Sequence, residues 1–183
     1  MSNFPDRDNA ALIVIDVQNS VVPDAWNRDC VIANINSLVE QAREAGTPVI
    51  WVQHSEEGMA IGSDNWQIVP ELKPLENEPN IRKLYRSSFE ETNLESVLAE
   101  LKVEHLFITG AQSNNCVRHT THAALERGYD VTLVEDAHTT SDSQWDSGTL
   151  PASVIVDETN QNFMNYSLPG RVANIETTEK VIF

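Results

Sequence analysis

Residues 10–15, Ala-Ala-Leu-Ile-Val-Ile, are apolar without interruption, and this run constrains the fold of the chain more than any other feature. A strand with one face in water alternates apolar and polar residues, so an unbroken apolar run predicts a strand that is buried on both faces, as in a parallel sheet. Three further segments are predicted to be strands, and segments with helical periodicity lie between the strands. This alternation predicts an α/β fold with a mainly parallel sheet. The four predicted strands are residues 10–15, 48–53, 103–109 and 129–135.

Shorter segments complete the predicted architecture. A last strand over residues 172–175 and an extended piece at 80–86 bring the expected sheet to five or six strands. Residues 54–79 and 141–150 have no clear periodicity, and long loops of this kind are often functional. We expect Cys30, just before the first helix, to be a small packed residue. The predicted helices are residues 31–44, 94–101, 115–127 and 151–166.

Length and charge restrict the function. A chain of 183 residues is expected to form a single domain spanning 1–183. The net charge of −16 argues against nucleic acid and membrane surfaces as partners, because both require positive patches. It favours a small-molecule substrate that is neutral or cationic over a polyanionic one. No stretch approaches the roughly 20 apolar residues of a membrane span. Residues 1–9 are polar and acidic, so we expect a cytoplasmic location.

The segment Gly110-Ala-Gln-Ser-Asn-Asn-Cys116 connects the third predicted strand to the third predicted helix. This order places Cys116 in the first turn of that helix. A helix N-terminus offers unpaired backbone N–H groups and the positive end of the macrodipole. Both favour a thiolate over a thiol, so we expect a lowered pKa and a nucleophilic role for Cys116.

Two further ionisable residues stand where they can reach this cysteine. Asp16 directly follows the first predicted strand, and Lys83 lies on the extended piece with the same parity as Ile81. The carboxyl ends of parallel strands meet at one edge of the sheet, which is where ligands bind in open α/β folds. We expect Asp16 to act as the general base and Cys116 to attack a carbonyl carbon. Lys83 would stabilise the charges, and backbone N–H groups near the helix start would bind the oxyanion.

Together these pieces resemble the isochorismatase-like cysteine hydrolases, a family that includes nicotinamidases, carbamoylsarcosine amidases and streptothricin hydrolases. The resemblance implies a Rossmann-like three-layer sandwich and an Asp16–Lys83–Cys116 triad. It also implies a cis peptide bond between Ala111 and Gln112 that turns the Gln112 N–H toward the oxyanion. The matching pieces are Leu12-Ile-Val-Ile-Asp16-Val-Gln, Lys83 with Ser87-Ser-Phe89, Gly110-Ala-Gln-Ser-Asn-Asn-Cys116-Val with Thr120, and Gly128-Tyr-Asp-Val-Thr-Leu-Val-Glu-Asp136-Ala.

The chain departs from this pattern at the metal site. Nicotinamidases of the family bind a metal through an Asp-x-His pair after the second strand. Here Val52 stands two residues before His54, and no histidine lies between His54 and Lys83. We therefore expect no metal and no cofactor. The presence of Cys116 favours acyl chemistry, so the predicted activity is cysteine-dependent hydrolysis of a C–N bond in an amide, lactam, imide or carbamoyl group, through a thioester.

Two alternatives remain at this stage. The first is an isochorismatase-type vinyl-ether hydrolase, which would need cations for the substrate carboxylates, and Arg82, Arg86 and Arg118 are available. The second is a non-catalytic family member that serves as a binding or assembly subunit. The intact set of three triad residues argues against this second alternative.

Four residues are candidates to line the substrate pocket. His54 ends the second predicted strand, Trp66 and Tyr85 lie in or just after the irregular segment, and His138 follows the fourth predicted strand. The competing interpretation for the aromatic residues is that they anchor the long loop to the body of the protein. The family resemblance also implies a homodimer or a homotetramer.

Overall fold

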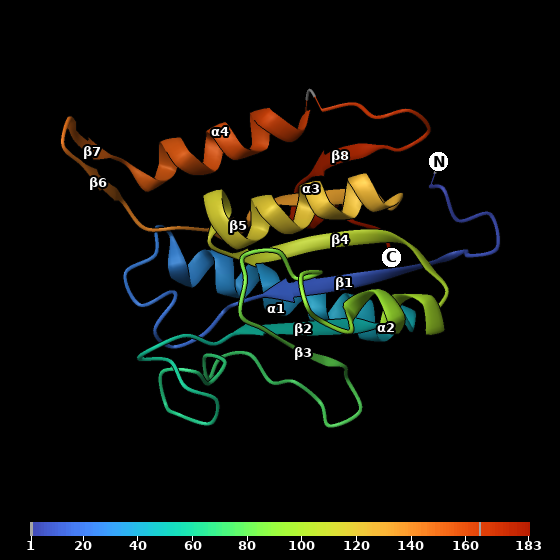
Figure 1. Cartoon of the computed structure of the whole chain (residues 1–183), viewed down its shortest axis with the longest axis horizontal. Helices are drawn as coiled ribbons and strands as arrows, with labels where there is room; N and C mark the ends of the chain where they lie inside the picture. Colours follow the sequence, from blue (N-terminus) through green and yellow to red (C-terminus); the bar gives the residue numbers. More distant parts are fainter. Residues whose placement is uncertain (1, 165) are drawn as a thin grey trace.

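A six-stranded sheet runs through the middle of the molecule in the order β3-β2-β1-β4-β5-β8, and all of its strand pairs are parallel (Figure 1). The computed structural model describes residues 2–164 and 166–183. The strands of this sheet are β1 (Asn9–Ile15), β2 (Val49–His54), β3 (Asn80–Lys83), β4 (Val103–Ala111), β5 (Asp130–Thr139) and β8 (Ala173–Glu176). The expected α/β fold with a mainly parallel sheet is therefore confirmed.

Helices cover both faces of the sheet. Helix α1 (Arg28–Ala45) lies on one face together with the short 3-10 helix η2 (Thr178–Lys180). The opposite face carries α2 (Leu94–Glu100), α3 (Arg118–Arg127) and α4 (Ala152–Met164), as Figure 1 shows. A hairpin of β6 (Ser143–Trp145) and β7 (Gly148–Leu150) projects from the carboxyl end of the sheet.

The alternation of side chains along β1 explains why its sequence is apolar throughout. Ala11, Ile13 and Ile15 pack under the helices α2 and α3, whereas Leu12 and Val14 pack against α1. Successive residues of a strand point to opposite faces, and here both faces are covered. The central strands are therefore held rigidly from both sides, and their carboxyl ends form a fixed platform for side chains.

Three local features differ from the sequence-based expectation. Strand β5 continues through the segment that was expected to be a loop, so His138 lies in the strand. The β6–β7 hairpin was not expected. Helix α1 begins at Arg28, which places Cys30 in its first turn. The expectation that Cys30 is packed was wrong, because Cys30 lies outside the buried face of the helix and is exposed.

The helices in the part of the chain that the structure describes are too short or too polar to cross a bilayer.

Candidate active site

Asp16 and the turn that carries Cys116 are brought together by the pairing of the two central strands. Ile15, the last residue of β1, pairs with Gly110 near the end of β4. Gly110 has a φ of 115°, and a Cβ atom built on it would lie 2.1 Å from the carbonyl oxygen of Ile15. Only glycine allows this conformation and this close approach. The backbone contact therefore fixes where Asp16 stands relative to the turn.

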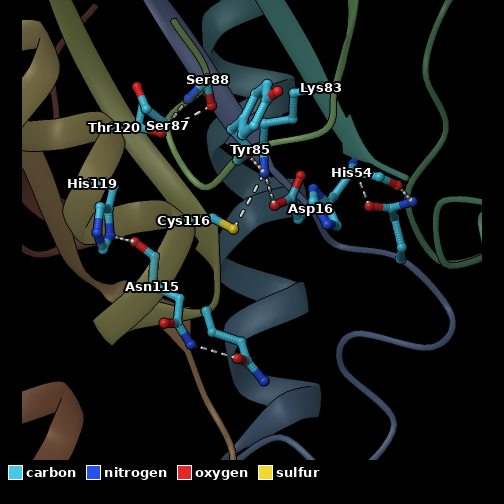
Figure 2. A network of polar contacts seen from close by, with 12 residues as sticks. Asp16, His54, Lys83, Tyr85, Ser87, Ser88, Asn115, Cys116, His119 and Thr120 are labelled. Carbon is cyan, nitrogen blue, oxygen red and sulfur yellow. Dashed lines mark hydrogen bonds and ion pairs between the residues drawn. The ribbon is translucent and has the colours of Figure 1, made fainter. Parts of the chain in front are cut away.

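Lys83 is fully buried at the end of β3 and is surrounded by three electron-rich groups. Its Nζ lies 2.6 Å from Oδ2 of Asp16 and donates hydrogen bonds of 3.2 Å to Sγ of Cys116 and to the carbonyl oxygen of Tyr85. An ammonium group has three N–H donors, so it can engage all three groups at once. Figure 2 shows Lys83 between Asp16 and Cys116. The structure thus brings together the three residues of the predicted triad.

Cys116 lies in a single π-helical turn, Ser113–Val117, that leads into α3. The N–H groups of Asn115 and Val117 both donate to the carbonyl oxygen of Gln112, at 3.0 and 3.2 Å. The peptide bond between Ala111 and Gln112 is cis, as the family resemblance implied. We expected a regular first turn of an α-helix here, and the π-turn is a local departure of the kind often found at functional sites.

The electrostatics of the triad differ from the expectation for the thiol. Burial and, to a lesser extent, the negative charge of Asp16 raise the pKa of Cys116 to about 12, although Lys83 opposes both effects. Burial also raises the pKa of Asp16 above its ordinary value, with Lys83 opposing. The expectation of a lowered thiol pKa was therefore wrong, because desolvation and the neighbouring carboxylate outweigh the helix terminus and the ammonium group.

These shifts describe a site in which the proton is held on sulfur until it moves to Asp16. Transfer of the thiol proton to Asp16 leaves the net charge of the triad unchanged. The transfer also removes the carboxylate charge that opposes the thiolate, and it leaves the thiolate beside the ammonium group of Lys83. No charge has to enter the buried site from solvent, so Asp16 is placed to act as an internal base.

A pocket of about 250 Å³ opens directly above Asp16 and Cys116. Its charged groups besides Asp16 are Glu56 and Arg86, and Nε2 of His54 lies 3.6 Å from Oε2 of Glu56. The prediction that His54 lines the pocket is therefore consistent with its position. Of the residues proposed for the oxyanion, Gln112 lines the pocket and Ala111 is buried beneath it. The pocket is lined by Asp16, Ser20, Val21, His54, Glu56, Met59, Arg86, Gln112, Asn115 and Cys116.

Trp66 and Tyr85 do not belong to this pocket wall. Trp66 is 7 % exposed, and its carbonyl oxygen accepts hydrogen bonds from the buried side chains of Gln18 and Gln53. It anchors the long loop to the sheet, which was the competing interpretation. The ring of Tyr85 is 47 % exposed, and the contribution of this residue to the site is its backbone carbonyl, which accepts from Lys83.

His138 also lies outside the pocket, and the prediction that it lines the pocket was wrong. It is 1 % exposed and sits beneath the π-turn. Its Nδ1 is 2.8 Å from Oγ of Ser113, and its Nε2 is 2.8 Å from Oδ1 of Asn160 on α4. Burial lowers the pKa of His138 to about 4, so the ring stays neutral near pH 7. We call Ser113, His138 and Asn160 the support cluster.

A hydroxyl pair links the segment after Lys83 to α3. The N–H of Ser88 donates to Oγ1 of Thr120 at 3.0 Å, and the two hydroxyl groups lie 2.9 Å apart (Figure 2). Both residues are fully buried. The contact holds the chain that follows Lys83 against the helix that follows Cys116.

Sequence reasoning did not assign Glu56, Met59 or Asn115 to the pocket, and it considered Arg86 only as a cation for the vinyl-ether alternative. The spacing of Glu56 two residues after His54 was the one available signal, because strand parity puts such a pair on one side. Among residues 2–164 and 166–183, no group of three or more His, Cys, Asp or Glu side chains has an arrangement that could hold a metal ion.

Comparison with known proteins identifies the class to which this fold and site belong. The family model of the isochorismatase domain matches residues 10–150. The chain is 33 % identical to the uncharacterized isochorismatase family protein YddQ of Bacillus subtilis, over 92 % of this chain and 96 % of that protein. It is also 33 % identical to a streptothricin hydrolase of Streptomyces noursei, over 81 % of this chain and 62 % of that protein.

A solved structure shows the same architecture. The crystal structure of an isochorismatase from Pseudomonas putida KT2440 superposes with a TM-score of 0.86 at 32 % identity, covering 95 % of this chain and 90 % of that one. The chain therefore belongs to the isochorismatase family. It is a hydrolase of the α/β type, and the family resemblance read from the sequence is confirmed.

Proposed function

We propose that this protein is a cysteine-dependent hydrolase that cleaves a C–N bond of a small molecule through a thioester at Cys116. One observation carries the proposal. A buried ammonium group, Nζ of Lys83, lies 2.6 Å from the carboxylate of Asp16 and 3.2 Å from the sulfur of Cys116, at the floor of a pocket of about 250 Å³. This arrangement places a base, a nucleophile and a charge stabiliser around one point.

The reaction begins with transfer of the thiol proton from Cys116 to Asp16. The sulfur attacks the substrate carbonyl carbon, and the oxyanion that forms is bound by the backbone N–H groups of Gln112 and Cys116. The C–N bond breaks as the leaving nitrogen takes the proton from Asp16, and ammonia or an amine departs. Asp16 then takes a proton from water, and the hydroxide attacks the thioester carbon. The C–S bond breaks, the acid leaves, and the proton on Asp16 returns to sulfur, which restores the thiol.

In this series of reaction steps, Lys83 supplies a positive charge beside both Asp16 and Cys116. Its contacts with Asp16, Cys116 and the carbonyl of Tyr85 hold the ammonium group in place in each protonation state. When the proton is on Asp16, Lys83 neutralises the thiolate. When the proton is on sulfur, Lys83 neutralises the carboxylate. The reaction needs only these side chains and water.

The same geometry disfavours the two alternatives raised by the sequence. Of the three arginines considered for an isochorismate-like acid, Arg118 pairs with Glu158 and Arg82 stacks over Trp66, so only Arg86 lines the pocket. An acid with two carboxylates would meet one arginine and the carboxylate of Glu56. A binding subunit has no use for a buried acid–ammonium–thiol set beneath an open pocket.

The direct test is detection of the thioester. Mass spectrometry of the protein quenched in acid during turnover of an amide panel should show an acyl group on Cys116. Cys116→Ala should show none and should lose turnover by about 10⁴-fold or more, while its circular dichroism and melting temperature stay near those of the wild type. Full hydrolysis by purified Cys116→Ala would refute the mechanism.

A further inference from the structure

One nitrogen in the wall of the catalytic pocket has no hydrogen-bond partner within the protein. Nδ1 of His54 is buried, and no residue in the part of the chain that the structure describes bonds to it. The side chain of His54 is 16 % exposed and lines the same pocket as Asp16 and Cys116. Leaving a buried polar atom unpaired costs stability, so an unpaired nitrogen beside a reactive site is a feature that the reaction has to explain.

The main chain holds His54 firmly at this place. His54 is the last residue of β2 and pairs in register with Lys83 of β3. The buried side chain of Gln18 accepts a hydrogen bond of 2.8 Å from the N–H of His54 and donates one of 3.0 Å to its carbonyl oxygen. These contacts fix the backbone from which the ring extends, and Figure 2 shows His54 next to Asp16.

A neighbouring carboxylate decides which ring nitrogen carries the proton. Oε2 of Glu56 lies 3.6 Å from Nε2 of His54, and its negative charge favours the tautomer with the proton on Nε2. Nδ1 is then a hydrogen-bond acceptor. Apart from the ion pair of Oδ2 with Lys83, the oxygens of Asp16 are also buried acceptors with no hydrogen bond from the described residues. Two kinds of unfilled acceptor, an imidazole nitrogen and a carboxylate, therefore stand in one pocket wall.

We propose that His54 and Asp16 together bind the water molecule that hydrolyses the thioester at Cys116. A water molecule has two O–H donors, which match these two acceptors, and its oxygen remains free to face the acyl carbon. Asp16 removes the proton from one O–H, while Nδ1 of His54 keeps a hydrogen bond to the other. The oxygen bonds to the acyl carbon, the C–S bond breaks, and the proton on Asp16 returns to sulfur. His54 itself gains and loses no proton.

This inference rests on the proposed function, and it concerns only the second half of the reaction. Formation of the thioester uses no water, so loss of His54 should slow thioester hydrolysis and spare acylation. The probe p-nitrophenyl acetate separates the two halves, because the initial burst of p-nitrophenolate reports acetylation of Cys116 and the later steady release reports hydrolysis of acetyl-Cys116. Mass spectrometry of the quenched protein locates the acetyl group, and Cys116→Ala, which should show no burst, is the blank.

His54→Leu and His54→Asn form a matched pair, because their side chains have nearly the same shape and only asparagine can place an acceptor oxygen near the position of Nδ1. We expect His54→Leu to slow thioester hydrolysis by about tenfold or more, with the burst rate within about twofold of the wild type, so that acetyl-Cys116 accumulates. His54→Asn should bring hydrolysis back to within about threefold of the wild type. Circular dichroism checks the fold of both variants, and His54→Ala, with the same expected loss, replaces His54→Leu if that protein misfolds.

Three results would overturn the role of His54 and leave the proposed function standing. They are an unchanged rate of thioester hydrolysis in His54→Leu, a loss in His54→Asn as large as that in His54→Leu, and an equal fall of acetylation and hydrolysis, which marks a general structural effect. A wild-type protein whose Cys116 takes up no acetyl group would refute the proposed function, and the inference would fall with it.

Discussion

The two sides of the π-turn at Ser113–Val117 carry two buried polar clusters that differ in how fully they are bonded. On one side, His138 of the support cluster uses both ring nitrogens, one with Ser113 and one with Asn160. On the other side, neither oxygen of Asp16 accepts a hydrogen bond of ordinary geometry from the part of the chain that the structure describes, although Oδ2 forms the ion pair with Lys83. The first cluster lies beneath the turn, and the second lies at the floor of the pocket.

The difference separates the residues that hold the turn in place from the residues that we propose to react. A buried group whose donors and acceptors are all satisfied has no capacity left for a ligand, and it holds its neighbours in one arrangement. A carboxylate with free acceptor positions beside a cavity can accept a proton or bind a substrate N–H. Both clusters stand at the carboxyl ends of neighbouring strands, so position in the sheet does not distinguish them.

The largest expected effect comes from Asp16→Asn, which changes the cluster at the floor of the pocket and leaves the support cluster intact. Turnover should fall by about 10³-fold, since the general base is lost. Alkylation of Cys116 by iodoacetamide near pH 8 should at the same time become faster, because removal of the Asp16 charge lowers the pKa of the thiol while Lys83 remains beside it. Steady-state kinetics measure the turnover, and mass spectrometry of the alkylated peptide measures the rate of alkylation at Cys116. Slower alkylation in Asp16→Asn would contradict the electrostatic account of the triad.

Gly110→Ala should disturb both clusters and lower the stability of the fold. Gly110 pairs with Ile15 of β1 and with His138 of β5, so it lies between the two clusters. A methyl group would meet the backbone of Ile15 in a conformation that L-residues disfavour, and we expect a loss of about 3 kcal/mol or more in the free energy of unfolding. Urea denaturation measures it. Gly148→Ala, also at positive φ but with no atom within 4 Å of the added Cβ, is the matched control and should cost about 1–2 kcal/mol.

The support cluster should give the protein a distinctive dependence of stability on pH. The folded-state pKa of His138 is lowered to about 4 from the model-compound value of 6.5, so below pH 6.5 the unfolded chain binds a proton that the folded chain does not. Stability from this residue is therefore fully present above about pH 6.5 and is lost as the pH falls toward 4. The unfolding free energy lost in this way is about 3 kcal/mol. The difference in unfolding free energy between wild type and His138→Gln, measured from pH 7.5 to 4.5, should shrink accordingly. A difference that is constant with pH would show that His138 is not the titrating group.

The smallest effect is expected from Ser113→Ala. It removes one hydrogen bond from Nδ1 of His138 and should cost about 1–2 kcal/mol of stability. Because Ser113 does not line the pocket, KM should stay within about twofold of the wild-type value in the folded protein. Denaturant titration and initial-rate kinetics at a fixed pH measure both quantities. A change in KM larger than the change in kcat would contradict this expectation and indicate that Ser113 contributes to substrate binding.

The sequence predicted the sheet and the positions of Asp16, Lys83 and Cys116 because these depend on local signals. The unbroken apolar run of residues 10–15 marks a strand that is covered on both faces, and Asp16, which follows it, must stand at the carboxyl edge of the sheet. His54 and His138 show the limit of this reasoning, because both were expected near strand ends and only His54 lines the pocket. The register of β5 shifts against β4 between Ile108 and Gly110, so β5 carries extra residues before His138 and this side chain is buried under the turn.

The composition of the pocket wall depends on contacts that local patterns do not contain. Glu56 and Met59 come from the long segment after β2, and its path is set by hydrogen bonds from Gln18 and Gln53 to the carbonyl of Trp66.

The close packing of Gly110 on Ile15 has a consequence for engineering the protein. Asp16 and the turn that carries Cys116 are spaced by main-chain atoms of two central strands, whereas part of the pocket wall comes from residues 54–59. Libraries that randomise or exchange this outer segment, keeping Gln18 and the Trp66 anchor, therefore sample new substrate preferences on an unchanged reaction centre.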